Sequence, residues 1–531
     1  MIRSVHRPQS ALPRAIAISV VIALSLVSLW NNSRSIDGVR YFWLDDDQMI
    51  SMRYARNLIE GHGLVYNPGE RVEGYTNFLW TLVMALVHLL PVTDATASLV
   101  VRLLNCGLTI LVLWQSERLL LEFRPRARMA TPLLLALLVL SHDLLFWSVH
   151  GFETTLITLL FVSVVLRIFQ EADAGAPRVA TFVSMGFLPL IRSDGFHLLA
   201  ALALLALGLA KDKRRTGWLS LLACALPLAH LAFRRSYYGN WGPNTYYLKV
   251  VGIALETRLT SGALYYLDVL ARYCVALPLA ILGAVRGRDR RRGLLLAGFA
   301  LSSGYAIWVG GDVFMGSRFV AHFVPVLFVL ACSAVDSFTI RGRAAPAVAG
   351  ALLAVSIAVD FCARVLGPFP SVFQDENGAP AASLVASLLV LRHSRADARI
   401  AVHAAGIVPY FSHRYAVDWL GKTDPHVARL PPHDDHIGHN RYDPEYSLGC
   451  GVDLVALAWL PPGLSRCTPR DRQSIGGAAP PWVRAMYLSP TFQREFCNHA
   501  IELNDAVPIY VRASAPEARS LEHWAPPAVS R

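Results

Sequence analysis

The 531-residue sequence predicts a polytopic α-helical membrane protein of about eleven transmembrane helices, followed by a C-terminal α/β domain. Hydrophobic residues make up 54% of the chain and charged residues only 16%, against roughly 25% charged in soluble domains. Long apolar runs recur as far as residue 362, after which the hydrophobic density falls and prolines appear. We therefore expect a transmembrane domain over 1–362 and a second domain over 363–531.

The predicted spans are apolar runs that approach the length of about 20 residues needed to cross a bilayer. The first follows three arginines and ends in LVSLWNN, a poor cleavage site, so we expect a retained signal anchor with a cytoplasmic N-terminus. The eleven runs are 12–30, 98–118, 131–148, 154–170, 178–191, 195–210, 216–233, 266–285, 293–309, 319–336 and 346–362.

A further apolar run, 75–91, is ambiguous, and the distribution of basic residues decides it. If this run dips into the membrane without crossing, nineteen basic residues fall on the side of the N-terminus, as the positive-inside rule requires. If it crossed, every later basic loop would face outward. We therefore predict that 75–91 belongs to a long first external loop, 31–97, and that residues 363–531 are also extracytoplasmic, at the inner (plasma) membrane.

The net charge of +11 does not indicate nucleic-acid binding. The basic residues lie in short clusters between apolar runs and not in one stripe, which is typical of membrane topology. The unusual polar motifs all fall on the predicted external face. They are DDD at 45–47, HGFE at 150–153, RSDG at 192–195, YYGNWGPNTYYLK at 237–249 and GGDVFMGSRF at 310–319.

Residues 363–531 carry short apolar runs separated by polar or helix-like segments, which predicts a small α/β domain. The runs are 399–406, 414–421, 452–460 and 506–513. Cys450, Cys467 and Cys497 lie in this part, and an exported domain would allow one disulfide among the three.

Asp45, Asp46 and Asp47 in the first loop precede a segment with helical spacing of apolar residues, ending at Gly61 and Gly63. This predicts an amphipathic helix lying along the membrane surface. An acidic N-cap is one interpretation of the three carboxylates. The other is a carboxylate that accepts a proton from an acceptor hydroxyl or binds a metal at the membrane face. Three consecutive carboxylates exceed what capping needs, which favours a catalytic role.

Other polar residues on this face are candidates for binding substrates, each with a structural alternative. Arg192 can bind an anion or pair with Asp194, and Arg318 beside Asp312 can bind a phosphate or snorkel to the interface. Aromatic and amide side chains around Asn244 suit either a sugar groove or an interfacial belt. The full set of candidate substrate-binding residues is Asp45, Arg53, Glu73, Asn77, Asp194, Asn244, Tyr246, Asp312, Asp424 and His426.

The C-terminal segment 433–446 is dense in histidine and aspartate. His433, His436 and His439 have a spacing that could bind zinc, but no helix or strand context supports a metal site. A polar surface that contacts a glycan acceptor is the preferred interpretation, and we predict no metal ligands.

Four segments carry a resemblance to a known family. They are DDQMISMRYARNLIEGHGLVYNPGERVEGYTNFLW, PNTYYLK, the irregular GGDVFMGSRF and LGKTDPHVAR. Together they resemble the bacterial terminal β-(1→2) arabinofuranosyltransferases, a family of C-type membrane glycosyltransferases that use polyprenyl-phosphate sugars. The resemblance runs through most of the chain and is strongest over 44–80.

The resemblance implies a decaprenyl-phospho-arabinofuranose donor, a cell-envelope glycan acceptor and catalysis outside the cytoplasm. The family's acidic pair maps onto Asp46 and Asp47, with Asp45 as an extra residue. Arg192, Arg318 and Lys249 are candidates for binding the donor phosphate. A β donor and a β product imply net retention, so a carboxylate can be a nucleophile or stabilise an oxocarbenium-like state, while simple inversion would use it as a base. Dependence on a divalent cation stays open.

Two other functions compete with this one. A polyprenyl-linked sugar transporter or flippase would carry ionisable residues in mid-span, whereas here they gather at one face. A transferase of another sugar, or one acting on pilin or lipopolysaccharide, shares the predicted architecture.

Overall fold

The structure is a computed structural model that describes residues 11–124, 130–312, 316–337, 344–366, 379–457, 475, 479–501, 507–524 and 529–530. The chain forms two compact units, each built from three separate segments. The helical unit comprises 1–28, 102–229 and 258–373, and the mixed unit comprises 29–101, 230–257 and 374–531. The mixed unit therefore unites the first predicted external loop with the C-terminal residues.

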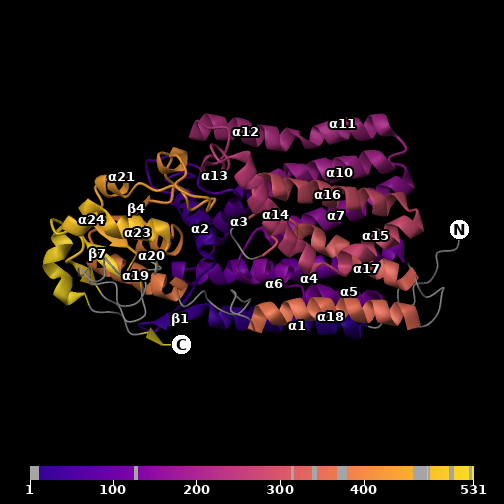
Figure 1. Ribbon diagram of the computed structural model, residues 1–531, viewed down its shortest axis with the longest axis horizontal. Coiled ribbons are helices and arrows are strands. Elements are labelled where there is room, and N and C mark those ends of the chain that lie inside the picture. Colours follow the sequence, from indigo (N-terminus) through magenta and orange to yellow (C-terminus); the bar gives the residue numbers. More distant parts are fainter. Residues whose placement is uncertain are drawn as a thin grey trace. The chain divides into compact units, whose positions relative to one another are not determined.

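The helical unit contains most of the long apolar helices, of which α1 ends in the mixed unit and α4 and α14 begin there. Their bounds are α1 Leu12–Asn31, α4 Asp94–Phe123, α5 Ala130–Val139, α6 His142–Val149, α7 Thr154–Ala174, α8 Val179–Gly186, α9 Leu188–Ile191, α10 Phe196–Leu209, α11 Lys213–Ala223, α14 Leu255–Arg272, α15 Ala276–Gly287, α16 Arg290–Val309, η1 Ala321–Phe323, α17 Val324–Ser337 and α18 Ala344–Leu366. Helices α10, α16 and α7 run side by side, as do α15 and α17 (Figure 1).

Six helices of the described chain are long and apolar enough to cross a membrane, or eight if two bent pairs each count as one span. The bent pairs are α5 with α6, at 49°, and α14 with α15, at 78°. Three other predicted spans form shorter apolar helices, over 179–191, 196–209 and 321–335. The chain is thus a multi-pass membrane protein, while the number eleven stays a prediction.

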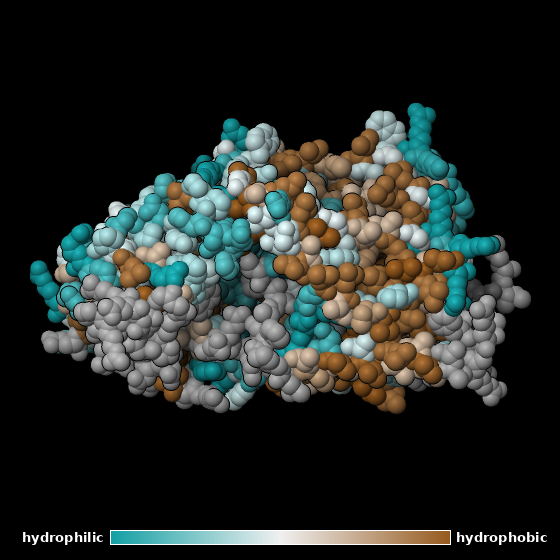
Figure 2. All heavy atoms as spheres, viewed as in Figure 1, coloured by the Kyte–Doolittle hydropathy of each residue, from teal (hydrophilic) through white to brown (hydrophobic). Residues whose placement is uncertain are grey.

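Large hydrophobic side chains are exposed on the helices of this unit. Figure 2 shows them over α15, α16 and α18, where Ile281, Leu301, Leu352 and Val359 are among the exposed residues. Apolar surface of this kind is unusual on a soluble protein and normal where a helix faces lipid.

The mixed unit contains the strands and the remaining helices. Their bounds are β1 Ser33–Ile36, β2 Val39–Phe42, α2 Asp46–Ile59, α3 Phe78–His88, α12 Ala225–Tyr238 (which begins in the helical unit), α13 Asn244–Lys249, α19 Ala379–His393, β3 Arg399–Val402, α20 Ile407–Ser412, β4 Tyr415–Asp418, η4 Val427–Arg429, α21 Pro444–Gly449, β5 Leu454–Ala456, α23 Pro481–Leu488, α24 Pro490–Glu495, β6 Ala500–Ile501, β7 Ile509–Val511, η5 Pro516–His523 and β8 Val529–Ser530.

A five-stranded mixed sheet, in the order β4-β3-β5-β7-β6, is the centre of this unit. Strand β3 is parallel to β4 and β5, and β7 is antiparallel to β5 and β6. Each of the four short apolar runs predicted in the C-terminal part contains one of these strands, so the α/β prediction is confirmed. A second sheet pairs β1 with β2 and β8.

Alternate residues of the central strands face two different apolar cores, as the two-residue period of a strand requires. Ile400 and Val402 of β3 pack in one core with α19, α20 and α2. Ala401, between them, packs in the other core with α21, α23 and α24. Helices thus cover both faces of the sheet.

Helix α2 forms where the sequence predicts a helix, and the positive φ angles of Gly61 and Gly63 mark its end. The prediction that it lies amphipathically along the membrane surface is wrong, because all residues from Gln48 to Asn57 are buried. Its polar side chains form hydrogen bonds within the mixed unit, which allows all faces of the helix to be buried.

Helix α3, over Phe78–His88, occupies the ambiguous apolar run. Its 11 residues are about 17 Å long at about 1.5 Å per residue, which is short of the roughly 30 Å of a hydrocarbon core. This length agrees with the prediction that the run does not cross the membrane.

Candidate active site

The three consecutive aspartates begin α2 in the mixed unit, and each has a different environment. Asp45 is the N-cap of α2, and its side chain accepts a hydrogen bond of 3.1 Å from the backbone N–H of Asp47. The capping interpretation therefore applies to Asp45. It leaves the carboxylates of Asp46 and Asp47, on the first turn of α2, to make contacts elsewhere.

The carboxylate of Asp46 contacts the C-terminal part of the same unit. It accepts hydrogen bonds from the backbone N–H groups of Gly406, at 3.1 and 3.2 Å, and Ile407, at 2.9 Å. Burial raises the pKa of Asp46, although these donors and nearby Lys422 act in the opposite direction. Asp46 thereby attaches the start of α2 to the start of α20.

Asp47 forms an ion pair with Lys422, and both side chains are only partly buried, at 21% and 14% exposure. Burial alone would lower the pKa of Lys422, but Asp47, followed by Asp46, raises it above the ordinary value of a lysine. The lysine therefore stays charged at neutral pH. Asp47 is a carboxylate held beside a cation at a position that solvent reaches, which suits a base or a nucleophile.

The loop that carries Lys422 is held by two side chains. Asp418 accepts hydrogen bonds from the backbone N–H groups of Leu420 and Thr423. Burial raises the pKa of Asp418 to about 6. The amide of Asn244 donates to the carbonyl oxygens of Gly421, Lys422 and Asp424 at 2.8, 3.3 and 3.0 Å.

The other candidates in this unit make internal contacts. Arg53 is buried and donates to the carbonyl oxygens of Tyr66, Pro409 and Arg414 and to the side chain of Asn67. Glu73 forms a buried ion pair with Arg234, with N–O distances of 2.5 and 3.0 Å. These contacts give Arg53 and Glu73 structural roles, and a role in binding substrate stays a prediction for both.

Asn77 likewise makes internal hydrogen bonds, since its side-chain oxygen accepts from Ser51 at 2.8 Å and from Thr81 at 3.1 Å. This amide joins the start of α3 to α2. A role for Asn77 in binding substrate also stays a prediction.

Asp424, His426 and Tyr246 lie near the Lys422 loop and are better placed to meet a ligand. Asp424 accepts a hydrogen bond of 3.2 Å from the hydroxyl of Tyr446, and the ring of His426 stacks on Tyr446 at 4.0 Å. Tyr246 on α13 is 45% exposed. Aromatic rings beside polar groups suit a sugar, so these residues remain candidates for substrate contact.

The arginines predicted to bind the donor phosphate lie in the helical unit, and both pair with carboxylates there. Arg192 contacts Asp194 in a bidentate manner, at 2.8 and 2.9 Å, and Glu153 at 2.9 Å. Arg318 lies 2.7 Å from Asp312. Asp143 and Arg272 form a further buried ion pair in this unit. Sequence reasoning noted HGFE but did not single out Glu153 as a partner of Arg192.

Lys249, the third candidate for the phosphate, belongs to the mixed unit, at the end of α13. A Cβ atom at Gly438 would lie 3.0 Å from its Cε, so its chain packs against the histidine-rich segment. Burial, followed by the positive charges of Lys422 and Lys249, lowers the pKa of His439 to about 3. His439 is therefore neutral at physiological pH and adds no positive charge here.

The histidines with zinc-like spacing make separate contacts. His433 donates a hydrogen bond from Nε2 to the carbonyl oxygen of Tyr442, His436 lies near Asp434, and His439 stacks on Trp482. Within the described ranges, no three histidine, cysteine or acidic side chains lie close enough together to bind a metal ion.

Of the three cysteines in the C-terminal part, Cys497 is disulfide-bonded, Cys450 is free and Cys467 lies outside the described residues. Residues 313–315 of the motif GGDVFMGSRF also lie outside the described residues.

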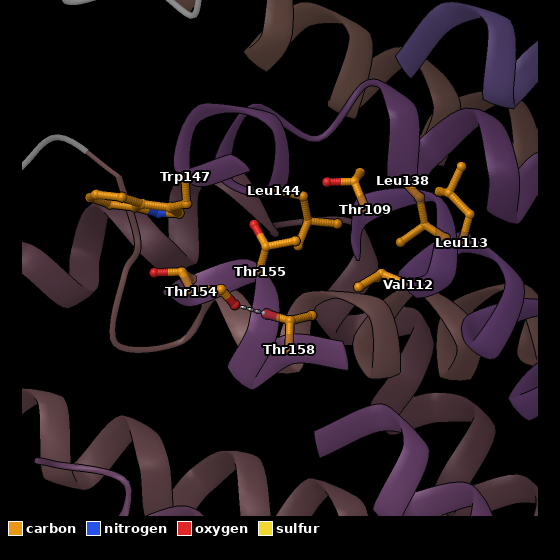
Figure 3. Close-up of a pocket in the computed structure, with 9 residues that line it drawn as sticks. All are labelled: Thr109, Val112, Leu113, Leu138, Leu144, Trp147, Thr154, Thr155 and Thr158. Atoms are coloured by element: carbon orange, nitrogen blue, oxygen red, sulfur yellow. Dashed lines mark hydrogen bonds between the residues drawn. The ribbon is translucent and has the colours of Figure 1, made fainter. Parts of the chain in front are cut away.

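A small hollow in the helical unit is lined by α4, α5, α6 and α7 (Figure 3). Its walls are leucine, valine and threonine side chains with Trp147, and the Oγ1 atoms of Thr154 and Thr155 are buried without a hydrogen-bond partner. None of the described residues that line it is charged. Its chemistry therefore differs from that of the carboxylate site in the mixed unit.

Comparisons with known proteins agree with the motifs. A domain family of unknown function, DUF8728, matches residues 377–480. The terminal β-(1→2)-arabinofuranosyltransferase of Mycobacterium tuberculosis is 29% identical over 269 residues, covering 47% of this chain and 42% of that protein. The protein of the same name from Corynebacterium glutamicum is 50% identical over 52 residues, covering 10% of this chain and 7% of that protein. The resemblance inferred from the motifs is thus confirmed.

Solved structures of two membrane enzymes share the fold. The oligosaccharyltransferase of Archaeoglobus fulgidus superposes with a TM-score of 0.58 at 11% identity, covering 94% of this chain and 73% of the other. ArnT of Cupriavidus metallidurans, solved with undecaprenyl phosphate, superposes with a TM-score of 0.55 at 10% identity, covering 94% and 98%. The chain has the glycosyltransferase C-type fold.

Proposed function

We propose that this chain is a membrane glycosyltransferase that transfers an arabinofuranosyl residue from decaprenyl-phospho-arabinose to a cell-envelope glycan. The observation that carries the proposal is the partly exposed Asp47–Lys422 pair at the start of α2, in a chain similar to two arabinofuranosyltransferases. The matched segments span 42% and 7% of those two relatives, so the activity is inferred from the site and not from the alignments alone.

The chemistry requires a carboxylate near the anomeric carbon and cations near the leaving phosphate. In an inverting transfer, Asp47 accepts the proton of the acceptor hydroxyl while that oxygen bonds to C1 and the bond from C1 to the phosphate oxygen breaks. In a retaining transfer, the carboxylate first bonds to C1 as the bond to the phosphate breaks, and the acceptor oxygen then displaces it while the hydroxyl proton passes to the released polyprenyl phosphate. Either way, polyprenyl phosphate leaves with the bonding electrons. The anomeric configuration of the product distinguishes the two routes.

The donor phosphate is a dianion when it leaves, and positive charge stabilises it. Arg192, Arg318 and Lys249 stay our candidates for this role. Because Arg192 and Arg318 each pair with carboxylates in the described structure, the phosphate would have to share them with Asp194 and Asp312.

The donor sugar can be tested with the purified full-length chain in detergent or liposomes. We expect transfer of radiolabel from decaprenyl-phospho-arabinofuranose to a synthetic arabinan oligosaccharide, and at least about tenfold less from decaprenyl-phospho-mannose, because a sugar site built for one shape rejects another. The product is measured by chromatography. Preferred transfer of mannose would replace the arabinose assignment by that of another sugar, and transfer of neither sugar would contradict the enzyme proposal.

We also propose that the mixed unit lies on the extracytoplasmic face, where the positive-inside rule puts it. Labelling of an introduced cysteine tests this in whole cells, in a background where the exposed Cys274 and Cys362 are serine. We expect Asp397→Cys, at an exposed residue of the mixed unit, to react with a membrane-impermeant maleimide. Lys213→Cys, at the exposed first residue of α11, should react only after the membrane is permeabilised. The opposite pattern would invert the topology.

A further inference from the structure

The segment 418–424 holds Lys422 in one position. Asp418 accepts hydrogen bonds from the N–H groups of Leu420 and Thr423 at 3.0 and 2.8 Å, and Asn244 binds three carbonyl oxygens of the same turn. Gly421 has a φ of 80°, where other residues are strained. A turn with this many internal bonds presents its lysine with little conformational freedom.

The first loop packs closely against this turn. A Cβ atom at Gly74 would lie 2.5 Å from Cγ2 of Thr423 and 3.0 Å from the carbonyl oxygen of Lys422. The hydroxyl of Tyr54, on α2, accepts a hydrogen bond of 2.8 Å from the N–H of Gly74. The segment that carries the aspartates and the turn that carries the lysine are therefore in direct contact within one unit.

Acidic groups dominate the surroundings of Lys422. Asp47 pairs with it directly, Asp46 lies on the same turn of α2, and Asp418 begins the lysine's own turn. Two buried imidazoles, His403 and His439, face the same region, and burial followed by Lys422 lowers the pKa of each to about 3. Lys422 thus supplies positive charge that these two histidines do not.

We infer that Lys422 is a positioning residue for the transfer reaction: its ammonium group pairs with Asp47 and aims that carboxylate at the reaction centre. This inference rests on the proposed function and adds a residue 375 positions away from Asp47. A cation beside a carboxylate favours the ionised form, and a fixed turn orients the pair better than a flexible loop. The role needs a positive charge on this turn more than it needs a particular side chain.

Variants at Lys422 test this through kcat, KM and pH. We expect Lys422→Met to lower kcat by about 100-fold, the cost of a misplaced catalytic group, with the donor KM changed less than about threefold. The acid limb of its pH–rate profile should move up by at least about one pH unit, because a carboxylate without its cation is protonated at higher pH. Lys422→Arg keeps the charge and should keep the wild-type acid limb and a rate within about tenfold.

Lys213→Met removes an exposed lysine of the helical unit and is the matched control. Thermal unfolding in detergent shows that each variant is folded, and Lys422→Gln replaces the Met variant if that variant is not. Equal losses in the Arg and Met variants, with an unmoved acid limb, would overturn the inference and leave the proposed function intact. A wild-type chain that transfers no sugar would overturn both.

Discussion

Replacing Asp47 with asparagine is expected to lower the rate of sugar transfer by about 10²–10⁴-fold, the usual contribution of a general base or acid. Asparagine has nearly the shape of aspartate but neither accepts a proton nor forms a covalent intermediate. Lys422 would also lose its charged partner. The measurement is the initial rate of label transfer from decaprenyl-phospho-arabinofuranose, at a pH where the wild-type rate is maximal.

Asp212→Asn is the matched control for this variant. Asp212 is exposed at the N-cap of α11, where its side chain accepts a hydrogen bond from the N–H of Arg215, and asparagine caps a helix as well as aspartate does. We expect the control to keep the wild-type rate. A folded Asp47→Asn protein that transferred sugar as fast as the control would remove Asp47 from the mechanism.

The second large effect is expected at Gly406. A Cβ atom there would lie 1.8 Å from the backbone oxygen of Asp46 and 2.7 Å from its carbonyl carbon. Both are main-chain atoms of the first turn of α2, so no flexible side chain can move aside. We expect Gly406→Ala to lower the free energy of unfolding of the mixed unit by about 3 kcal/mol or more, at the upper end of overpacking costs. It should also abolish transfer by displacing Asp46 and Asp47.

Protease sensitivity of the mixed unit in detergent measures this loss of stability. Gly449→Ala serves as the control, because Gly449 lies in the same unit and its Cβ would meet nothing within 4 Å. If Gly406→Ala resisted protease and transferred sugar as the control does, the close contact between α2 and the start of α20 would be unimportant for the site.

Four of the strands, β3, β4, β5 and β7, and most helices follow from local patterns in the sequence. The four apolar runs after residue 398 are short and bounded by polar residues, and each contains a strand. The burial of α2 could not be predicted in this way. Arg53 and Asn57 are polar, and they are buried because they donate to carbonyl oxygens outside the helix: Arg53 to that of Arg414, and Asn57 to those of Val65 and Tyr66. A pattern read along one helix does not reveal those acceptors.

The sequence also pointed to part of the candidate site. The run Asp45–Asp47 stands out because consecutive carboxylates close to an apolar span are costly. Lys422 and Gly406 were missed, because their contacts with Asp47 and Asp46 join positions 375 and 360 residues apart. A signal was present, since Lys422 belongs to LGKTDPHVAR, the motif from which Asp424 and His426 were selected. Its glycine and aspartate indicated a turn that could present the lysine.

The candidates for the donor phosphate divide between the two units. Arg192 and Arg318 belong to the helical unit, with their partners Glu153, Asp194 and Asp312, and Lys249 belongs to the mixed unit. From the sequence alone, we could predict only that all three residues lie on the same face of the membrane. Each arginine forms an ion pair with a carboxylate of its own unit. Each also carries the positive charge that could bind a phosphate.

The most direct test of the central claim is a single assay of two proteins: wild type and Asp47→Asn, purified together and given the same labelled decaprenyl-phospho-arabinofuranose and arabinan acceptor. We predict a labelled oligosaccharide extended by one arabinofuranosyl residue with the wild type, and a product at least about 100-fold less abundant with the variant. Absence of product from the folded wild type, or equal product from both, would contradict the assignment of this chain as a glycosyltransferase whose catalysis depends on the first-loop carboxylates.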